Sequence, residues 1–214
     1  MTGRRRFLSL TAAALALPCI VAAEEPTRRL LIFGDSLTAG YGLPRGRGLV
    51  PRLQSYLNRR NIAARVLNGG LSGDTTYGGR VRIGWSLARH RPDAVVVELG
   101  GNDMLAGWSV RKAEANMDAI LRSARAGGRP VLLVGVHPTR GEPAWRQGWI
   151  DLWPRLAARH GVPLLPDLYA PLAARPREAR RDLVLADGLH PSAKGVELMV
   201  QALGPAVVAL LQQR

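Results

Sequence analysis

Residues 30–44 of the chain read Leu-Leu-Ile-Phe-Gly-Asp-Ser-Leu-Thr-Ala-Gly-Tyr-Gly-Leu-Pro. The apolar run that opens this stretch is typical of a buried parallel strand, and Gly34 marks the turn at its carboxyl end. Because open α/β sheets bind ligands at that edge, Ser36 occupies the place of a nucleophile. Serine is also a common N-cap at the start of a helix. The stretch alone favours neither interpretation.

The rest of the chain alternates between patterns typical of strands and of helices. Further strands are predicted over residues 63–67, 94–99, 130–136 and 162–165, and helices over 47–60, 76–90, 109–125, 142–160 and 192–212. This alternation requires parallel strands with helices on both faces, which is a three-layer α/β/α sandwich. Residues 170–186 are expected to form a surface loop or a frayed helix within the same domain.

Tryptophans stand out in two of the predicted helices. In the helix over 76–90, the residues expected to face the core are Val81, Trp85 and Leu87. The helix over 142–160 carries three more tryptophans at four-residue spacing on one face, namely Trp145, Trp149 and Trp153. Core packing is the ordinary explanation of such a stripe, and contact with lipid is the alternative.

The first 23 residues are predicted to be a secretory signal peptide. Three arginines at positions 4–6 give a positive start, an apolar segment follows, and small residues end it at Ala23. The arginines followed by Phe7-Leu8 resemble a twin-arginine export signal, and general secretion is the alternative. Cleavage after Ala23 would leave residues 24–214 as a single domain, periplasmic or secreted.

The only cysteine, Cys19, lies inside that predicted signal. The residues before it do not resemble the small residues of a lipid-attachment site, so lipidation is the less favoured alternative. The domain that follows then has no cysteine and no disulfide, and a hydrophobic core must hold it together.

The chain is strongly basic, with a formal net charge of +14 at pH 7. The basic residues are arginines scattered along the chain rather than gathered in one run, and lysine is nearly absent, as in proteins of arginine-favouring genomes. We therefore expect a bias toward anionic surfaces, with at most peripheral membrane contact, and no nucleic-acid partner.

Three predicted strands end in glycine-rich turns, over residues 34–36, 69–73 and 100–103. Glycine lets the backbone approach a ligand and direct its N–H groups inward, although such turns are common in α/β proteins. None of them has the Gly-Lys-Ser/Thr of a phosphate loop or the Gly-x-Gly-x-x-Gly of a dinucleotide site. No cofactor is expected, and no metal, because no group of histidines and carboxylates has ligand spacing.

A nucleophilic serine needs a histidine as base and an acid to orient that histidine. His90 and His160 fall in the last turns of helices, where they suit the helix dipole, and His137 has no acid near it in sequence. His190 follows Asp187 by three residues, so the carboxylate can bend back to the ring Nδ1–H and leave Nε2 free. Taken singly, that segment is better explained as an ordinary turn with a surface histidine.

Four blocks of the chain, in the same order, resemble those of the SGNH, or GDSL, hydrolase family. They are Gly34-Asp35-Ser36-Leu37, Gly73, Gly100-Gly101-Asn102-Asp103 and Asp187-Gly188-Leu189-His190. They span almost the whole chain after residue 23. The longer strings around them are most similar to the bacterial multifunctional esterases, a branch that includes the periplasmic thioesterase I/lysophospholipase and the arylesterases.

The resemblance implies roles for five residues. Ser36 would be the nucleophile, His190 the general base and Asp187 the residue that orients it. The backbone N–H groups of Ser36 and Gly73 and the side-chain amide of Asn102 would form the oxyanion hole. The resemblance also implies a flavodoxin-like sandwich with five parallel strands in the order 2-1-3-4-5. Ser36 does not lie in Gly-x-Ser-x-Gly, so the strained elbow of the α/β-hydrolases is not expected.

The same resemblance implies a substrate class. It predicts hydrolysis of carboxylic esters and thioesters with short to medium acyl chains, lysophospholipids among them, by a monomeric enzyme. Four apolar residues follow the site blocks and could line an acyl pocket, with ordinary packing as the alternative for at least half of them: Leu37, Met104, Leu105 and Trp108. Met104 stands where the thioesterase branch has a smaller residue, which leaves the preferred chain length open.

Two other functions are compatible with these residues. One is a carbohydrate O-deacetylase on the same scaffold. The other is a catalytically silent module that binds lipid or glycan, against which the intact Ser36, Asp187 and His190 argue.

Overall fold

A computed structural model describes residues 27–213 of the chain, and their centre is a sheet of five parallel strands. The strands are β1 (Arg28–Gly34), β2 (Ala64–Gly70), β3 (Ala94–Glu98), β4 (Val131–Val134) and β5 (Leu164–Leu165). Their order across the sheet is β2-β1-β3-β4-β5, and every neighbouring pair is parallel. The predicted sandwich and strand order are confirmed. The predicted signal peptide, Cys19 and the cleavage point lie outside the described residues.

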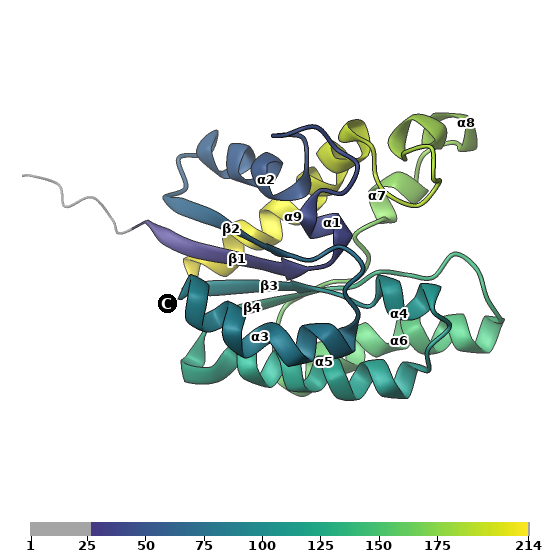
Figure 1. The fold of residues 1–214 in the computed structure, drawn as a ribbon. Coiled ribbons are helices and arrows are strands. Elements are labelled where there is room, and N and C mark those ends of the chain that lie inside the picture. The colour runs from purple at the N-terminus through teal and green to yellow at the C-terminus, as the bar shows by residue number, and fades with distance from the viewer. Residues whose placement is uncertain (1–26, 214) are drawn as a thin grey trace, which may run out of the picture.

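Long helices cover both faces of the sheet (Figure 1). One face carries α2 (Leu49–Asn58) and α9 (Ala193–Gln212), and the other carries α3 (Thr76–His90), α5 (Val110–Arg125) and α6 (Pro143–His160). The shorter helices are α1 (Ser36–Ala39), α4 (Gly101–Leu105), α7 (Ala170–Ala173) and α8 (Arg177–Arg180), with 3₁₀ turns η1 (Ala126–Gly128) and η2 (Arg181–Leu183). The predicted irregular region after residue 170 thus consists of α7, α8, η2 and the loops around them.

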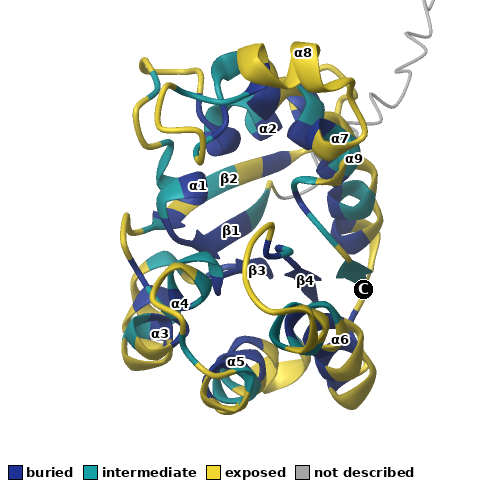
Figure 2. Ribbon diagram, turned by 90° about the vertical axis from the view of Figure 1, so that its right-hand side faces the viewer, coloured by how far each residue is buried: buried dark blue, intermediate teal, exposed yellow. Residues whose placement is uncertain are grey.

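Successive side chains of each strand point to opposite faces, so the sheet has a separate core on each side. Leu30 and Ile32 of β1 belong to the core under α2 and α9, whereas Leu31 and Phe33 belong to the core under α3, α5 and α6. All four side chains are fully buried. Figure 2 shows β1, β3 and β4 mainly in dark blue between two helical layers, whereas the edge strand β2 is partly exposed. The opening strand is therefore buried on both faces, as its unbroken apolar run predicts.

Helix α9 is apolar because it belongs to the core. Its mean hydropathy of 1.5 and its length would by themselves suit a membrane span. Its inward side, however, packs against α2 and the sheet through residues such as Met199, Leu203 and Val207, all almost completely buried. The composition of α9 is that of a helix packed inside a globular domain.

Helix α3 has the predicted bounds but not the predicted packing. Val81 and Trp85 do not face the core, since 69% and 63% of their surfaces are exposed; that prediction is wrong. Leu87 is partly buried. The buried side consists of Thr76, Gly79, Ile83 and Ser86. A Cβ atom at Gly79 would lie 2.4 Å from a Leu99 methyl group. Small residues therefore let α3 approach the sheet closely, and a search for apolar spacing overlooks such a face.

The tryptophan stripe of α6 is core packing for two of its three members. Trp149 and Trp153 are fully buried, and Trp153 Nε1 donates a hydrogen bond of 2.9 Å to the carbonyl of Val136. Trp145 is partly buried, and its Nε1 donates to the carbonyl of Trp108 at 3.2 Å. The alternative of a lipid-contacting stripe is therefore not supported.

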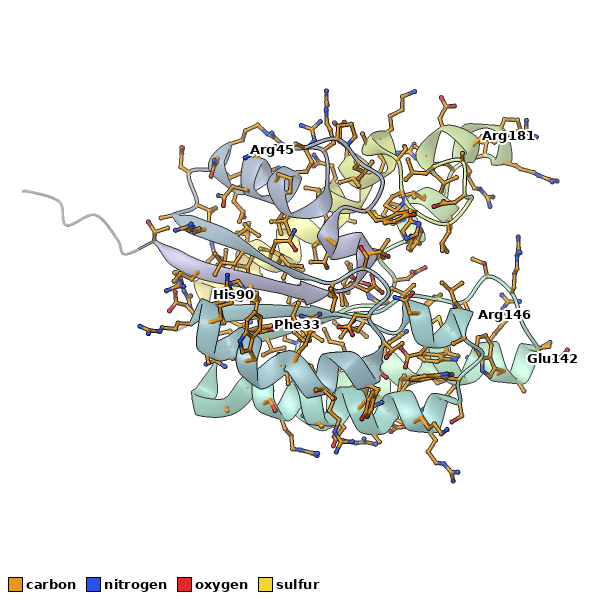
Figure 3. The ribbon with its side chains drawn as sticks, viewed as in Figure 1. Phe33, Arg45, His90, Glu142, Arg146 and Arg181 are labelled. Carbon is orange, nitrogen blue, oxygen red and sulfur yellow. The ribbon has the colours of Figure 1, made fainter. Side chains whose placement is uncertain are left out.

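The basic side chains are spread over the molecule, as their scatter in the sequence indicates. Figure 3 places Arg45 and Arg181 in the layer of α2 and α8, and Arg146 in the layer of α6. Several arginines bind carboxylates across helices, such as Arg155, which lies 2.9 Å from Glu114.

Candidate active site

Ser36 lies at the carboxyl end of β1, where it opens the short helix α1. Asp35, and not Ser36, caps this helix, because the Asp35 carboxylate accepts a hydrogen bond from the N–H of Leu37 at 3.0 Å. The hydroxyl of Ser36 is thereby left for another partner. Ser36 Oγ lies 2.9 Å from Nε2 of His190.

His190 is held by Asp187 in the segment before α9. Asp187 Oδ2 lies 2.7 Å from His190 Nδ1, and Oδ1 accepts the backbone N–H groups of Leu189 and His190 at 2.9 and 3.0 Å. These hydrogen bonds lower the pKa of Asp187 to about 2, and the bond with the His190 ring has the largest effect. The ionised carboxylate fixes the imidazole with Nδ1 as donor and Nε2 as acceptor. The Tyr41 ring packs against the His190 ring, with 4.5 Å between the two ring centroids.

The three predicted oxyanion donors follow adjacent strands of the sheet. Ser36 follows β1, Gly73 follows β2 and Asn102 lies in α4 after β3. Within residues 27–213, the N–H groups of Ser36 and Gly73 donate to no backbone carbonyl. Asn102 Nδ2 donates to the carbonyl of Asp74 at 2.8 Å and lies 3.3 Å from Asp35 Oδ2. Asn102 is thus hydrogen-bonded to Asp74 and Asp35, the immediate neighbours of Gly73 and Ser36. All five predicted site residues lie at the carboxyl edge of the sheet.

Three of the buried carboxyl groups near these residues have raised pKa values, and the motifs alone predict no function for them. Burial raises the pKa of Asp35 to about 6, and it also raises the pKa of Asp103, which accepts from Thr76 N at 2.8 Å. Glu98 is the last residue of β3 and accepts from Thr38 Oγ1 at 3.2 Å. Its burial and the nearby Asp35 raise its pKa well above the ordinary range. A lone acid inside the apolar run 94–99 is the signal that could have identified Glu98.

The other histidines do not reach Ser36. His160 Nε2 lies 2.8 Å from Asp118 Oδ1 between α6 and α5, a partner that the helix-end explanation did not foresee. His137 Nδ1 lies 3.6 Å from Asp167 Oδ2. His90 ends α3, as predicted.

The four apolar residues predicted near an acyl pocket have different environments. Leu37 is buried in the core under α2 and α9, and Met104 is partly buried between both cores. Leu105 is exposed. Of these four residues, only Trp108 lines a cavity, which has a volume of about 380 Å³. The other residues that line this cavity are Tyr77, Arg80, Lys112, Ala115 and Asn116. Among residues 27–213, no three His, Cys, Asp or Glu side chains gather as metal ligands.

A serine, a histidine and an aspartate joined in this order by hydrogen bonds are the arrangement by which serine hydrolases activate a hydroxyl group. Here they lie at the carboxyl edge of a flavodoxin-like parallel sheet. Residues 32–198 match the GDSL-like Lipase/Acylhydrolase family, and the chain belongs to this family.

Known proteins support the same assignment. The chain is 31% identical to the esterase TesA of Pseudomonas aeruginosa, over 94% of this chain and 98% of that protein. It is 32% identical to thioesterase 1/protease 1/lysophospholipase L1 of Escherichia coli K12, over 76% and 75% of the two chains. The structure of the psychrotrophic esterase EstA from Pseudoalteromonas sp., inhibited by monoethylphosphonate, matches with a TM-score of 0.79 at 26% identity, over 87% and 100%. The protein is an ester hydrolase of the SGNH type.

Proposed function

We propose that Ser36 is the nucleophile, His190 the general base and Asp187 the residue that orients His190. The single observation that carries this proposal is the unbroken hydrogen-bond chain from Ser36 Oγ through both ring nitrogens to Asp187. No other histidine in residues 27–213 forms such a link to a serine hydroxyl and a carboxylate.

In the first half of the reaction, Ser36 Oγ attacks the acyl carbonyl carbon and its proton passes to His190 Nε2. The carboxylate of Asp187 stabilises the imidazolium that forms. The carbonyl oxygen becomes an oxyanion, which accepts hydrogen bonds from the N–H groups of Ser36 and Gly73 and from Asn102 Nδ2. The second N–H of Asn102 turns from Asp35, 3.3 Å away, toward that oxyanion. When the tetrahedral intermediate collapses, His190 returns the proton to the leaving alcohol or thiol.

In the second half, a water molecule replaces the leaving group. His190 accepts a proton from this water as it attacks the acyl-Ser36 carbonyl, and the same donors hold the second oxyanion. Collapse releases the carboxylic acid and returns the proton to Ser36 Oγ. Each residue is therefore used twice, and no cofactor takes part in either step.

The proposed substrates are carboxylic esters and thioesters of short to medium acyl chains, lysophospholipids included. The names of the relatives support both the ester and the thioester class. Exposed apolar side chains close to the proposed site residues in the chain support an acyl-bearing substrate, since contact with an acyl group would remove them from water. They are Tyr41, Leu71, Leu105 and Leu189, each within five positions of a proposed site residue.

We further propose that residues 1–23 direct export and that residues 24–214 act as a monomer in the periplasm or outside the cell. The positively charged start and apolar continuation of the chain support export.

The proposal is tested with a fluorophosphonate, which labels an activated serine, and with hydrolysis of p-nitrophenyl butyrate. The native chain should be labelled once per molecule, and Ser36→Ala should lose both label and turnover. Ser55→Ala serves as the control, because Ser55 donates to the Pro51 carbonyl within α2 and should change neither readout. Turnover by Ser36→Ala at the native rate would overturn the proposal, and an unlabelled native chain would favour a silent binding module.

A panel of acetylated xylan, p-nitrophenyl esters, acyl-CoAs and lysophospholipids defines the substrate. Faster turnover of the longer acyl esters and thioesters supports the proposed class. Activity confined to acetylated xylan would identify a carbohydrate O-deacetylase instead.

A further inference from the structure

Arg82 lies on α3, away from the proposed catalytic hydrogen-bond chain, yet its guanidinium contacts the ends of two strands and the loop after β2. Nε donates to Asp74 Oδ2 at 2.6 Å, Nη1 to the carbonyl of Gly69 at 2.8 Å and Nη2 to the carbonyl of Gly34 at 2.8 Å. Each of the three guanidinium nitrogens therefore has its own acceptor. The acceptors come from β1, β2 and the loop that follows β2.

These acceptors stand next to the proposed oxyanion donors. Gly34 precedes Ser36 by two positions, and Asp74 directly follows Gly73. The carbonyl of Asp74 accepts the hydrogen bond from Asn102 Nδ2 at 2.8 Å. One guanidinium is thus linked, through one or two residues, to all three donors.

The loop that carries Gly73 is held at its two ends. The N–H of Leu71 donates to the carbonyl of Gly34 at 3.1 Å, and the N–H of Asp74 donates to the carbonyl of Leu71 at 3.0 Å. Residues 71–73 are exposed, and a Cβ atom at Gly73 would meet no atom within 4 Å. The loop is buried again only at Asp74, whose side chain is 5% exposed beside the 19% exposed Arg82. The position of the Gly73 N–H therefore depends on how Leu71 and Asp74 are attached at the two ends of the loop, and Arg82 binds the carboxylate of Asp74.

Arginine suits this task better than lysine would. Its planar guanidinium stays charged and presents donors in fixed directions, whereas an ammonium group is a flexible point charge. The Arg82 guanidinium also lies over the Phe33 ring, 4.0 Å from its centroid. Phe33 itself is fully buried in β1, so the plane of the guanidinium is held by the core.

We propose that Arg82 is a positioning residue, which aligns the N–H of Gly73 and the amide of Asn102 with Ser36 for the developing oxyanion. This inference rests on the proposed function of those three residues as oxyanion donors. The guanidinium of Arg82 binds Asp74 and the carbonyls of Gly69 and Gly34, not the side chains of Ser36, Asp187 or His190, so it acts through Asp74. Its contribution should therefore be larger in the transition state than in the bound ground state.

The test compares Arg82→Ala and Arg82→Lys with Arg89→Ala, in which an exposed arginine of the same helix is removed. Hydrolysis of p-nitrophenyl butyrate gives kcat and KM, and n-butylboronic acid, which forms a tetrahedral adduct with a serine oxygen, reports on the oxyanion site. Because a displacement of about 1 Å can cost roughly 10²-fold, Arg82→Ala should lose about 10²-fold in kcat with KM unchanged. The affinity for the boronic acid should fall by a similar factor.

A second measurement separates positioning from a general loss of structure. Guanidinium chloride at sub-denaturing concentration should restore part of kcat to Arg82→Ala, and should not raise kcat in Ser36→Ala. Arg82→Lys should lie between the native chain and Arg82→Ala, because lysine can reach Asp74 but cannot reproduce all three hydrogen bonds. Arg89→Ala should keep native kcat, KM and boronic-acid affinity.

Two results would overturn the positioning role. One is a native kcat and boronic-acid affinity in a folded Arg82→Ala or Arg82→Lys, and the other is a change confined to KM. Fluorophosphonate labelling of the native chain, absent in Ser36→Ala, keeps these results distinct from a failure of the proposed function. If the native chain is not labelled, the oxyanion hole itself is in doubt, whatever Arg82 does.

Discussion

His190 Nε2 lies 2.9 Å from Ser36 Oγ, although 154 positions separate the two residues in the chain. Ser36 opens α1 directly after the first strand, and His190 precedes the last helix. Parallel strands make this meeting possible, because all of them end at the same edge and the following loops lie side by side. On the far side of the imidazole, Asp187 Oδ2 lies 2.7 Å from His190 Nδ1.

Replacing Asp187 by asparagine should lower kcat strongly. An amide can neither stabilise the imidazolium nor hold the required tautomer, and the equivalent loss elsewhere costs about 10⁴-fold. Because the Asp187 side chain is 39% exposed, water can replace part of its effect, and we expect about 10²- to 10⁴-fold. The measurement is hydrolysis of p-nitrophenyl butyrate. Asp182→Asn is the control, since the exposed side chain of this acid in the preceding segment binds Lys194, and its bond to Ser192 is made by the backbone carbonyl, which the substitution keeps. Equal activities of the two variants would contradict the role of Asp187.

Asn102→Ala should lower kcat by roughly 10²- to 10³-fold, as removal of one oxyanion donor does in other hydrolases. KM should change little, because the proposed hydrogen bond forms as the oxyanion develops. Asn58→Ala, at the exposed end of α2, should keep native kinetics. A rise in KM at native kcat would show instead that Asn102 binds the ground state.

The fold and the proposed triad could be predicted because they leave local marks in the sequence. Gly34-Asp35-Ser36 follows an unbroken apolar run, and Asp187 stands three positions before His190. Each of these patterns is contained within a few residues. The meeting of His190 with Ser36 could be inferred only from a resemblance to a family, since no spacing rule connects residues so far apart.

Arg82 and the buried face of α3 leave no such marks. Arg82 binds two backbone carbonyls and Asp74, so its partners depend on how the strand ends are placed in space. The inward side of α3 is made of Thr76, Gly79, Ile83 and Ser86, in which small size counts for more than hydrophobicity. For that reason Trp85 is exposed, although its hydrophobicity predicts a core position.

Glu98→Gln should change how stability depends on pH. Burial raises the pKa of Glu98 above its ordinary value of 4.5, so the folded state holds this proton more tightly than the unfolded state does. The contribution of Glu98 to stability is therefore complete below pH 4.5 and is lost as the pH rises through the raised pKa. Glutamine keeps the shape and an acceptor for Thr38 but has no proton to lose.

The melting temperature of Glu98→Gln should accordingly fall less than that of the native chain as the pH is raised above 4.5 and through the raised pKa of the native group. A smaller dependence of the melting temperature on pH should remain in the variant, because burial also raises the pKa of Asp35 to about 6. The exposed Glu178 provides the control, and Glu178→Gln should follow the native curve. Parallel curves for native protein and Glu98→Gln would contradict the assignment of the raised pKa to Glu98.

Trp153→Ala should destabilise the fold far more than Trp85→Ala. Trp153 is fully buried, and its ring lies against the backbone of the two turns after β3 and β4, since a Cβ atom at Gly100 or Gly135 would come within 2.9 Å of it. Emptying such a site costs about 3–5 kcal/mol, whereas the exposed Trp85 should matter by no more than about 0.5 kcal/mol. Urea unfolding measures both values. Equal losses of stability in the two variants would contradict the packing described for α6. Because Gly100 directly precedes α4, which carries Asn102, Trp153→Ala should also lower kcat.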